Sequence, residues 1–186
     1  MCEDDALKNK MILLTALFGI GFIISLPVFM ITKNAAFEVL TITLGVTLYH
    51  FAMRLAVGAV IHAIMKNKAD HTRAWFREKR FERVLYRWMR VREWKKHIPS
   101  YSPETFDTRQ RTVEEIVGAT CQAEIVHEVI MLLSLLPIAL IPLLGGAVAM
   151  IVTSVLSILI DAPFVVVQRY NRPRLVRVME RFPKIG

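Results

Sequence analysis

The sequence predicts an all-α integral membrane protein, a single domain with four transmembrane helices and an amphipathic helix at the membrane interface between the second and the third. Apolar residues make up 54% of the 186-residue chain, which also contains 24 lysines and arginines. These two kinds of residue are segregated, because residues 66–111 hold fourteen of the basic side chains whereas four long stretches hold almost none. A bilayer is crossed by about 20 consecutive apolar residues, and a soluble protein would have nothing to bury four such helices. The stretches are 11–32, 36–65, 116–144 and 147–167.

The first two transmembrane helices are predicted over residues 11–32 and 36–65, with a tight polar connection at Lys33 and Asn34. No small-residue cleavage site follows the first stretch, so we expect an anchor that is kept rather than a signal peptide. At 1.5 Å per residue the second helix is about 45 Å long, more than the hydrocarbon thickness of about 30 Å. We therefore expect it to tilt or to project into the cytoplasm.

Residues 72–94 show a different pattern, in which apolar side chains share one face of a helical wheel and arginines share the opposite face. The apolar face is Phe81, Val84, Leu85, Trp88 and Val91, and the basic face is Arg80, Arg83, Arg87 and Arg90. This pattern is typical of a helix that lies in the headgroup plane with its apolar side toward lipid.

The third and fourth transmembrane helices are predicted over residues 113–143 and 147–168. Two prolines, Pro137 and Pro142, and the pair Gly145-Gly146 predict a tight hairpin between them. The fourth helix is expected to end at Gln168, where a basic run begins.

The distribution of basic residues predicts the orientation of the chain. The N-terminal lead has two, the loop 66–111 has fourteen and the tail from residue 168 has six, whereas the other two connections have one and none. Cytoplasmic segments of membrane proteins collect Lys and Arg. We therefore expect a multi-pass membrane protein with both termini in the cytoplasm. Its net charge of +8 then reflects contact with anionic lipid, and no nucleic-acid partner is expected.

Ionisable side chains inside the predicted transmembrane helices are candidates for function, because they are costly in lipid unless paired or hydrated. Two sets share a helix face, one in the second helix and one in the third, and a single acid lies in the fourth. They are His50 and Arg54, then Glu124, His127 and Glu128, and finally Asp161.

Two interpretations of the third-helix set remain open. Glu124 could orient the imidazole of His127, which would then take a proton from a hydroxyl nucleophile. Alternatively, Arg54 pairs with Glu124 or Glu128 and holds the helices together. The motif Glu-x-x-His is also half of a carboxylate di-iron site, but the second half is missing and no metal is expected. Asp161 is interpreted as a residue that pairs helices.

The segment after the fourth helix mixes three arginines with other polar residues, and charge alone does not account for the latter. It reads Gln168-Arg169-Tyr170-Asn171-Arg172-Pro173-Arg174-Leu175. Because a guanidinium presents a planar fork that suits phosphate or carboxylate, this segment predicts a shaped anion site at the membrane face.

Three blocks of the sequence resemble the glycosyl-4,4′-diaponeurosporenoate acyltransferase family of small bacterial membrane proteins. They are Val91-Arg92-Glu93-Trp94-Lys95, Ala123-Glu124-Ile125-Val126-His127 and the run from Val167 to Leu175. The resemblance extends over about residues 75–178 and implies that the membrane is a bacterial inner (plasma) membrane. It implies transfer of a fatty acyl group to a hydroxyl or amine of a lipid-borne sugar or other polar headgroup. It also favours Glu124 and His127 over Glu128, because the first two fall within a matching block.

On this reading His127 is the general base and Glu124 holds its tautomer and stabilises the imidazolium. The remaining candidates are assigned to substrate binding. The anionic part of a donor or headgroup is bound by Arg169, Arg172 and Arg174. That pocket is shaped by Gln168, Tyr170 and Asn171 and closed by Trp94 and Lys95. His50 and Arg54 are the last two residues assigned to substrate binding.

The expected partners are a membrane lipid and an acyl donor, for which an acyl thioester is suitable because its polar carrier lies in the cytoplasm. No cofactor is expected, and the sequence leaves the oligomeric state open. The alternative is a non-catalytic membrane protein that binds anionic lipid or partner subunits. A metal-dependent lipid oxidase or hydroxylase is a third candidate.

Overall fold

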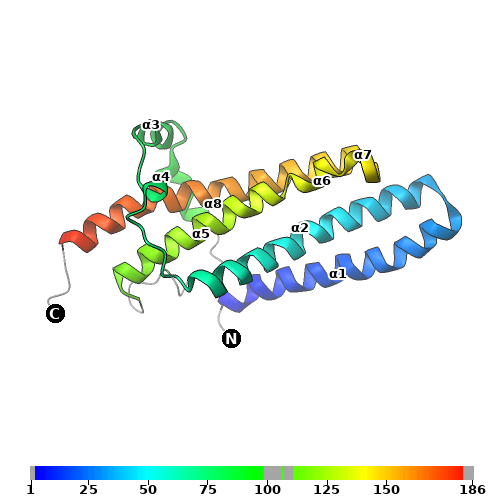
Figure 1. Cartoon of the computed structure of the whole chain (residues 1–186), viewed down its shortest axis with the longest axis horizontal. Helices are drawn as coiled ribbons and strands as arrows, with labels where there is room; N and C mark the ends of the chain where they lie inside the picture. Colours follow the sequence, from blue (N-terminus) through cyan, green and yellow to red (C-terminus); the bar gives the residue numbers. More distant parts are fainter. Residues whose placement is uncertain (1–2, 99–105, 107–110, 182–186) are drawn as a thin grey trace. The chain divides into compact units, whose positions relative to one another are not determined.

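The computed structural model of the chain describes residues 3–98, 106 and 111–181, and its elements are helices without any strand in that part of the chain (Figure 1). This confirms the all-α prediction. The long helices are α1 (Glu3–Thr32), α2 (Ala35–Met65), α5 (Val113–Leu133) and α8 (Ala147–Arg181). The short ones are η1 (Ala74–Phe76), α3 (Arg80–Trp88), α4 (Val91–Trp94), η2 (Lys95–His97), α6 (Leu136–Ala139) and α7 (Ile141–Leu144).

Four helical segments are long and apolar enough to cross a membrane, as the sequence predicts. They are Leu7–Thr32, Ala35–Met65, Val113–Leu144 and Ala147–Arg181. Many of their large apolar side chains are exposed, among them Ile31, Leu143 and Val148. Monomeric soluble proteins rarely expose apolar surface on this scale, so these side chains are suited to lipid and the protein is a membrane protein.

The chain divides into two compact units, and α2, α5 and α8 each contribute residues to both. The first unit comprises Met1–Gly58 and Val129–Ile160, and the second comprises Ala59–Glu128 and Asp161–Gly186. The single membrane domain expected from the sequence stays a prediction. So does the cytoplasmic position of the two ends, because residues 1–2 and 182–186 lie outside the described part.

In the first unit, α1 and α2 form a helical hairpin. Its connection is built by Lys33, whose φ is +54°, and by Asn34, whose Oδ1 accepts a hydrogen bond from the Ala36 N–H (2.8 Å). Asn is favoured both in such turns and as the first cap of a helix. Close packing follows at Gly45, because a Cβ there would meet the Phe22 ring at 2.9 Å.

The first unit also has polar contacts between helices that are otherwise apolar. The hydroxyl of Tyr49 donates to the Leu133 carbonyl (2.9 Å), and the hydroxyls of Ser134 and Ser157 lie 2.6 Å apart. The predicted hairpin between the third and fourth helices is present. Its turn has Gly145 and Gly146 at φ +70° and +64°, a conformation that other residues seldom adopt.

In the second unit, α2 ends at Met65 and the chain turns back onto α5. The turn uses positive φ angles at Lys66 and Asn67, and the Asn67 N–H donates to Gln122 Oε1 (2.8 Å). A Cβ at Gly118 would lie 2.3 Å from the Asn67 carbonyl oxygen. Glycine at position 118 therefore permits the backbone of the turn to lie directly against α5.

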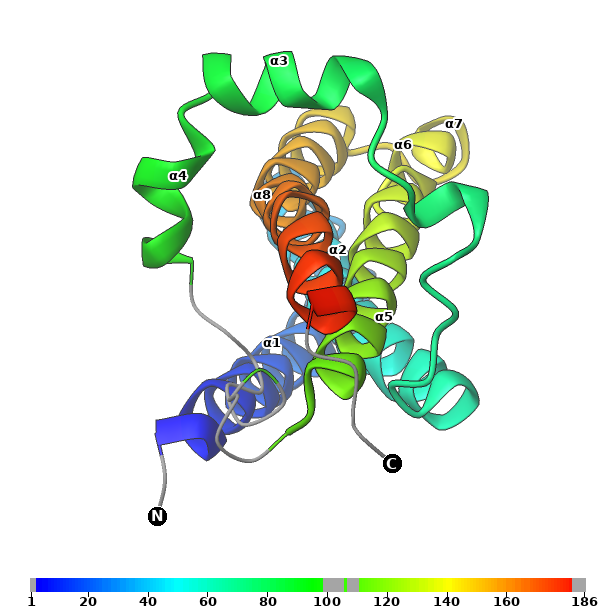
Figure 2. The ribbon, with the colours of Figure 1, turned by 90° about the vertical axis from the view of Figure 1, so that its left-hand side faces the viewer.

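The segment 72–94 is not one continuous helix as the sequence suggested, because it is divided into η1, α3 and α4. The break between α3 and α4 is at Arg90, which has a left-handed conformation with φ +50°. Helix α3 lies across the direction of α8, beside its C-terminal half (Figure 2). Its apolar residues Phe81, Val84 and Trp88 are exposed, and the residues it buries are Glu82 and Tyr86.

Helices α5 and α8 complete the second unit. Helix α5 begins with a capping box, in which the Thr112 hydroxyl accepts from the Glu115 N–H (3.2 Å) and Glu115 Oε2 accepts from the Thr112 N–H (2.9 Å). Helix α8 continues through Pro163 and Pro173 to Arg181, past the residue where the sequence predicted its end. The basic segment from Gln168 onward is thus helical, which fixes the spacing of its side chains.

Candidate functional site

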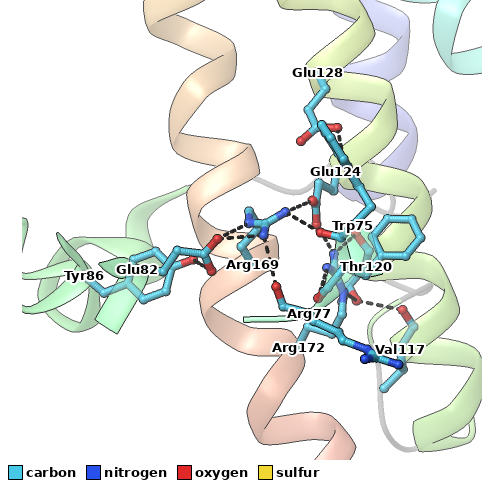
Figure 3. Close-up of polar contacts among 11 residues, drawn as sticks. Trp75, Arg77, Glu82, Tyr86, Val117, Thr120, Glu124, Glu128, Arg169 and Arg172 are labelled. Atoms are coloured by element: carbon cyan, nitrogen blue, oxygen red, sulfur yellow. Dashed lines mark hydrogen bonds and ion pairs between the residues drawn. The ribbon is translucent and has the colours of Figure 1, made fainter. Parts of the chain in front are cut away.

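Glu124 of α5 is fully buried and is held by two arginines of α8 (Figure 3). One carboxylate oxygen accepts a hydrogen bond from Arg169 and the other from Arg172. Arg172, whose side chain is 2% exposed, also donates to the Thr120 hydroxyl (3.2 Å), to the Thr120 carbonyl (3.1 Å) and to the Phe76 carbonyl (3.2 Å). This network joins α5, α8 and the segment before α3.

Arg169 extends the same network to α3. Its Nε and Nη2 donate to Glu82 Oε1 at 3.0 and 2.7 Å, and it also donates to the carbonyls of Trp75 (3.2 Å) and Arg77 (3.4 Å). The other oxygen of Glu82 accepts from the Tyr86 hydroxyl (3.0 Å). Burial, and then the Glu82 carboxylate, raise the pKa of Tyr86. This phenol therefore stays a donor.

Arg169 and Arg172, which the sequence predicts to bind a ligand's anion, are engaged by groups of the protein itself, and their binding role stays a prediction. A guanidinium has five N–H donors, and all five of Arg169 are used within the protein when its bond to Glu124 is included. Two buried carboxylates, Glu82 and Glu124, balance the two arginines. The network therefore links α5, α8 and α3 through paired charges.

His127, one turn after Glu124, contacts a different carboxylate. Its Nδ1 lies 2.8 Å from Asp161 Oδ1, and its ring stacks on Phe164 with centroids 4.5 Å apart. The expected pair of Glu124 with His127 is thus replaced by His127 with Asp161. The physical reason is that the α8 arginines engage both oxygens of Glu124, whereas Asp161 and Phe164, three residues apart on α8, present one face to the imidazole.

The His127–Asp161 pair has the arrangement of an oriented general base. In the neutral imidazole, an Nδ1–H that donates to the Asp161 carboxylate leaves Nε2 as the acceptor. Asp161 is buried, whereas 21% of the His127 side chain is exposed. The ring can therefore meet a substrate while its orientation is fixed by the carboxylate and by Phe164.

Glu128 has a separate partner, because its Oε2 accepts a hydrogen bond from the Trp75 indole N–H (3.0 Å). The alternative in which Arg54 pairs with Glu124 or Glu128 stays a prediction, since Arg54 lies in the first unit and the glutamates lie in the second. There, Arg54 donates to the Ser157 hydroxyl (2.7 Å) and to the His50 carbonyl (3.2 Å). His50 itself is buried.

Of the two residues predicted to close the site from the loop side, Lys95 contacts α8 directly. Lys95 donates to Asn171 Oδ1 (2.7 Å) and lies 5.0 Å from the centre of the Tyr170 ring. Arg174 lies over the same ring at 3.6 Å. Burial, and then the charges of Arg174 and Arg92, lower the pKa of Lys95.

The two remaining candidates of this set are Trp94 and Gln168. The Trp94 indole donates to the Met89 carbonyl (2.8 Å), so it stabilises the turn between α3 and α4. Gln168 is half-buried on α8.

Asp161, which the sequence analysis interpreted as a residue that pairs helices, does join α8 to α5 through His127. Its partner was not predicted, and two further residues of the site were missed. Glu82 and Tyr86 were not singled out, and their i, i+4 spacing between the apolar and the basic face of α3 was the available signal. Within the described residues, no three His, Cys, Asp or Glu side chains are grouped as a metal site would require.

The comparisons with known proteins cover the part of the chain that contains these contacts. The family model described as glycosyl-4,4′-diaponeurosporenoate acyltransferase matches residues 72–181, which is more than half of the chain. The match includes the three blocks on which the resemblance was based and confirms it. It also contains both His127 with Asp161 and the network around Glu124. No curated protein and no solved structure matches the chain.

Proposed function

The chain belongs to the glycosyl-4,4′-diaponeurosporenoate acyltransferase family, and we propose that it moves a fatty acyl group from a thioester onto a hydroxyl or amine of a lipid-borne sugar or polar headgroup at the cytoplasmic leaflet. The single observation that supports this best is the pair His127–Asp161, held at 2.8 Å within the matched region. A histidine with a carboxylate on one nitrogen and partial exposure on its ring is a common general base for acyl transfer.

The proposed step uses the free nitrogen of His127. Nε2 takes the proton from the acceptor hydroxyl while the oxygen attacks the thioester carbonyl carbon. The C–S bond then breaks, and the leaving thiolate takes that proton back from the imidazolium, so that an ester and a free thiol are formed. Asp161 stabilises the imidazolium in between and fixes the tautomer at the start. Glu124 is a positioning residue on this account, because it anchors α5 to α8 one turn from His127.

The proposed membrane position of the site is supported by exposed side chains and by charge. Helix α3 presents Phe81, Val84, Leu85 and Trp88 to its surroundings, and the side chain of Trp88 is 81% exposed. An amphipathic helix with such a face lies at the level of the lipid headgroups. Because the basic segments 66–111 and 168–186 favour the cytoplasmic side of a bacterial inner membrane, we place the acceptor headgroup there.

The test is acyl transfer by the pure protein. Wild type in lipid nanodiscs, given a radiolabelled acyl thioester and a total lipid extract of the host, is expected to label a lipid. Loss of the base should lower the rate about 10²–10⁴-fold in His127→Ala, because this is the usual contribution of general-base catalysis. Asp161→Asn should lower it as well, since an amide that accepts from the ring does not stabilise the imidazolium.

The matched control is His97→Ala, because His97 is an exposed histidine in η2. Its rate should equal that of wild type, and all variants should elute as folded protein in size-exclusion chromatography. A His127→Ala protein with unchanged turnover would remove the base from the mechanism. A deletion strain with an intact lipid profile would contradict acyl transfer altogether.

A second function, binding of anionic lipid or partner subunits without catalysis, is favoured by one observation. Two of the three arginines that were expected to bind substrate, Arg169 and Arg172, are engaged with Glu82 and Glu124 and link helices. Full function in cells of a chain that carries both Glu124→Gln and His127→Asn would support this alternative over the enzyme.

A further inference from the structure

The second unit contains a large open cavity to which the catalytic step described above assigns no role. Its volume is about 1060 Å³, and it is lined by residues of the segment 71–93 and by the last turns of α8, from Tyr170 to Glu180. Pockets for small molecules and cofactors have volumes of about 300–1,000 Å³. The cavity is therefore large enough for a sizeable ligand.

The lining is strongly basic, with eight arginines against three glutamates. Three of these arginines have carboxylate partners: Arg83 with Glu78 (2.9 Å), Arg90 with Glu93 (3.9 Å), and Arg172 with Glu124. Five others form no ion pair within the described residues. They are Arg77, Arg87, Arg92, Arg174 and Arg177.

Several of these five arginines are held in place by neutral groups that leave their charge uncompensated. Arg77 donates to the Thr72 carbonyl (3.0 Å) and Arg177 to the Pro173 carbonyl (3.1 Å), while Arg174 stacks on Tyr170. Like charges gathered around one cavity repel one another, and the lowered pKa of the nearby Lys95 reflects this repulsion in part. An anionic ligand would relieve it.

The shape of the site distinguishes it from a general lipid-facing basic surface. The unpaired arginines come from two segments about 80–100 residues apart in the sequence and line one concavity. Two aromatic rings that line the cavity are already covered by arginine side chains, since Arg172 lies over Phe76 (4.9 Å) and Arg174 over Tyr170 (3.6 Å). The ligand is therefore recognised by several negative charges rather than by stacking of a base.

The position of the cavity along α8 limits the kind of donor. Its lining begins at Tyr170 and includes Arg174, which lie nine and thirteen residues after Asp161. At 1.5 Å per residue this separation is about 14–20 Å along the helix. A donor with phosphate directly on the acyl group could not reach both places, whereas one with a long arm between phosphates and thioester could.

We infer that this cavity binds the phosphate groups of the acyl donor, and that the donor is a thioester whose carrier bears several phosphates at the end of a long arm, as coenzyme A does. The inference rests on the proposed function, since it names the donor for that reaction. Arg87 on α3 and Arg174 and Arg177 on α8 supply the charge, and a guanidinium binds phosphate through paired hydrogen bonds. The phosphates stay in the cavity, and the arm extends toward His127.

The test is binding of coenzyme A to the whole protein in nanodiscs of neutral phosphatidylcholine, measured by isothermal titration calorimetry. Coenzyme A should bind, dephospho-coenzyme A should bind more weakly, and pantetheine, which has no phosphate, should not bind. The variant Arg174→Gln/Arg177→Gln should raise the Kd about tenfold or more, because each loss of a charge-assisted hydrogen bond costs affinity on this scale. The control Arg80→Gln removes an exposed arginine of α3 that does not line the cavity and should leave the Kd unchanged.

Equal binding of pantetheine and coenzyme A, or an unchanged Kd in the double variant, would overturn the inference. So would binding of phosphatidylglycerol vesicles through these arginines with no binding of coenzyme A, which would make the cavity a site for lipid headgroups. The proposed function is tested separately by acyl-lipid formation in cells. If wild type forms the lipid and His127→Ala does not, absence of coenzyme A binding refutes the donor alone.

Discussion

At the scale of single residues, Glu124 has a demanding environment. It is fully buried in an apolar helix, where an ionised carboxylate is costly unless its hydrogen bonds are satisfied. Arg169 and Arg172 satisfy it, and Glu82 supplies the second negative charge. The four side chains are coupled, since removal of one carboxylate leaves an arginine charge buried without compensation.

Glu124→Gln should therefore lower stability strongly, although it preserves size and shape. Breaking a buried ion pair by removing one partner costs about 3–5 kcal/mol, which corresponds to a Tm lower by roughly 6–20 °C for a chain of this length. The measurement is thermal unfolding in detergent, followed by tryptophan fluorescence. Glu114→Gln is the control, because Glu114 is exposed on the same helix. A Tm no lower than that of the control would show that the network is not needed for stability.

The sequence identified His127 and Glu124 as a pair, and the structure assigns them different partners. A spacing of three or four residues places side chains on one helix face but leaves open which neighbours lie opposite. Those neighbours come from α8, so the choice between Asp161 and Glu124 depends on tertiary packing. The sequence could predict the face and the residue types, but the carboxylate that contacts the imidazole needed the structure.

At the scale of elements, the turn after α2 is fixed to α5 by one glycine. Gly118→Ala would bring a Cβ to 2.3 Å from the Asn67 carbonyl oxygen, where only a backbone shift could accommodate it. Overpacking of this kind typically costs about 1–3 kcal/mol, even though Ala is the better helix former. We expect a lower Tm in the same fluorescence assay, together with faster amide hydrogen exchange at Asn67, whose N–H donates to Gln122.

The matched control for this change is Gly58→Ala. Gly58 also lies within a long helix, α2, but a Cβ there would meet no atom within 4 Å. Its Tm should stay the same or rise, because Ala has less backbone entropy to lose. Equal behaviour of the two variants would mean that the contact between Gly118 and the turn is not tight.

The segment 72–94 shows where element prediction from sequence reached its limit. The alternation of apolar and basic residues correctly indicated a helical face at Phe81, Val84, Leu85 and Trp88. It did not indicate the break at Arg90, since arginine has no special preference for the left-handed conformation seen there. The break lets Val91 turn into the cluster formed with Tyr86 and Tyr170, so tertiary burial decides the backbone at this point.

At the scale of the whole molecule, the sequence was most informative about the four long helices. Length and apolarity over about 20 residues are imposed by the bilayer rather than by neighbouring elements, which is why 11–32 and 36–65 could be predicted closely. The extension of α8 to Arg181 could not be predicted in this way. Its charged last turns are stabilised by contacts with other elements, such as that of Lys95 with Asn171.

The orientation of these helices gives the last prediction, and it depends on charge alone. Basic residues are concentrated in the loop 66–111 and in the tail after residue 168, whereas the connection at Lys33-Asn34 has one and the turn at Gly145-Gly146 has none. Under the positive-inside rule the basic segments face the cytoplasm. Single cysteines at Asn34 and at Arg92 should therefore label from opposite sides of the membrane in intact cells, Asn34→Cys with an impermeant maleimide and Arg92→Cys after permeabilisation.

The background for this experiment is a Cys2→Ser chain, since the remaining thiol, Cys121, is fully buried. Labelling of Arg92→Cys in intact cells would reverse the orientation and would place the arginine-lined cavity outside the cytoplasm. Coenzyme A thioesters are made and kept on the cytoplasmic side of the membrane. The side on which Arg92 is labelled therefore decides whether such a donor can reach His127, which links the topology of the helices to the chemistry proposed for them.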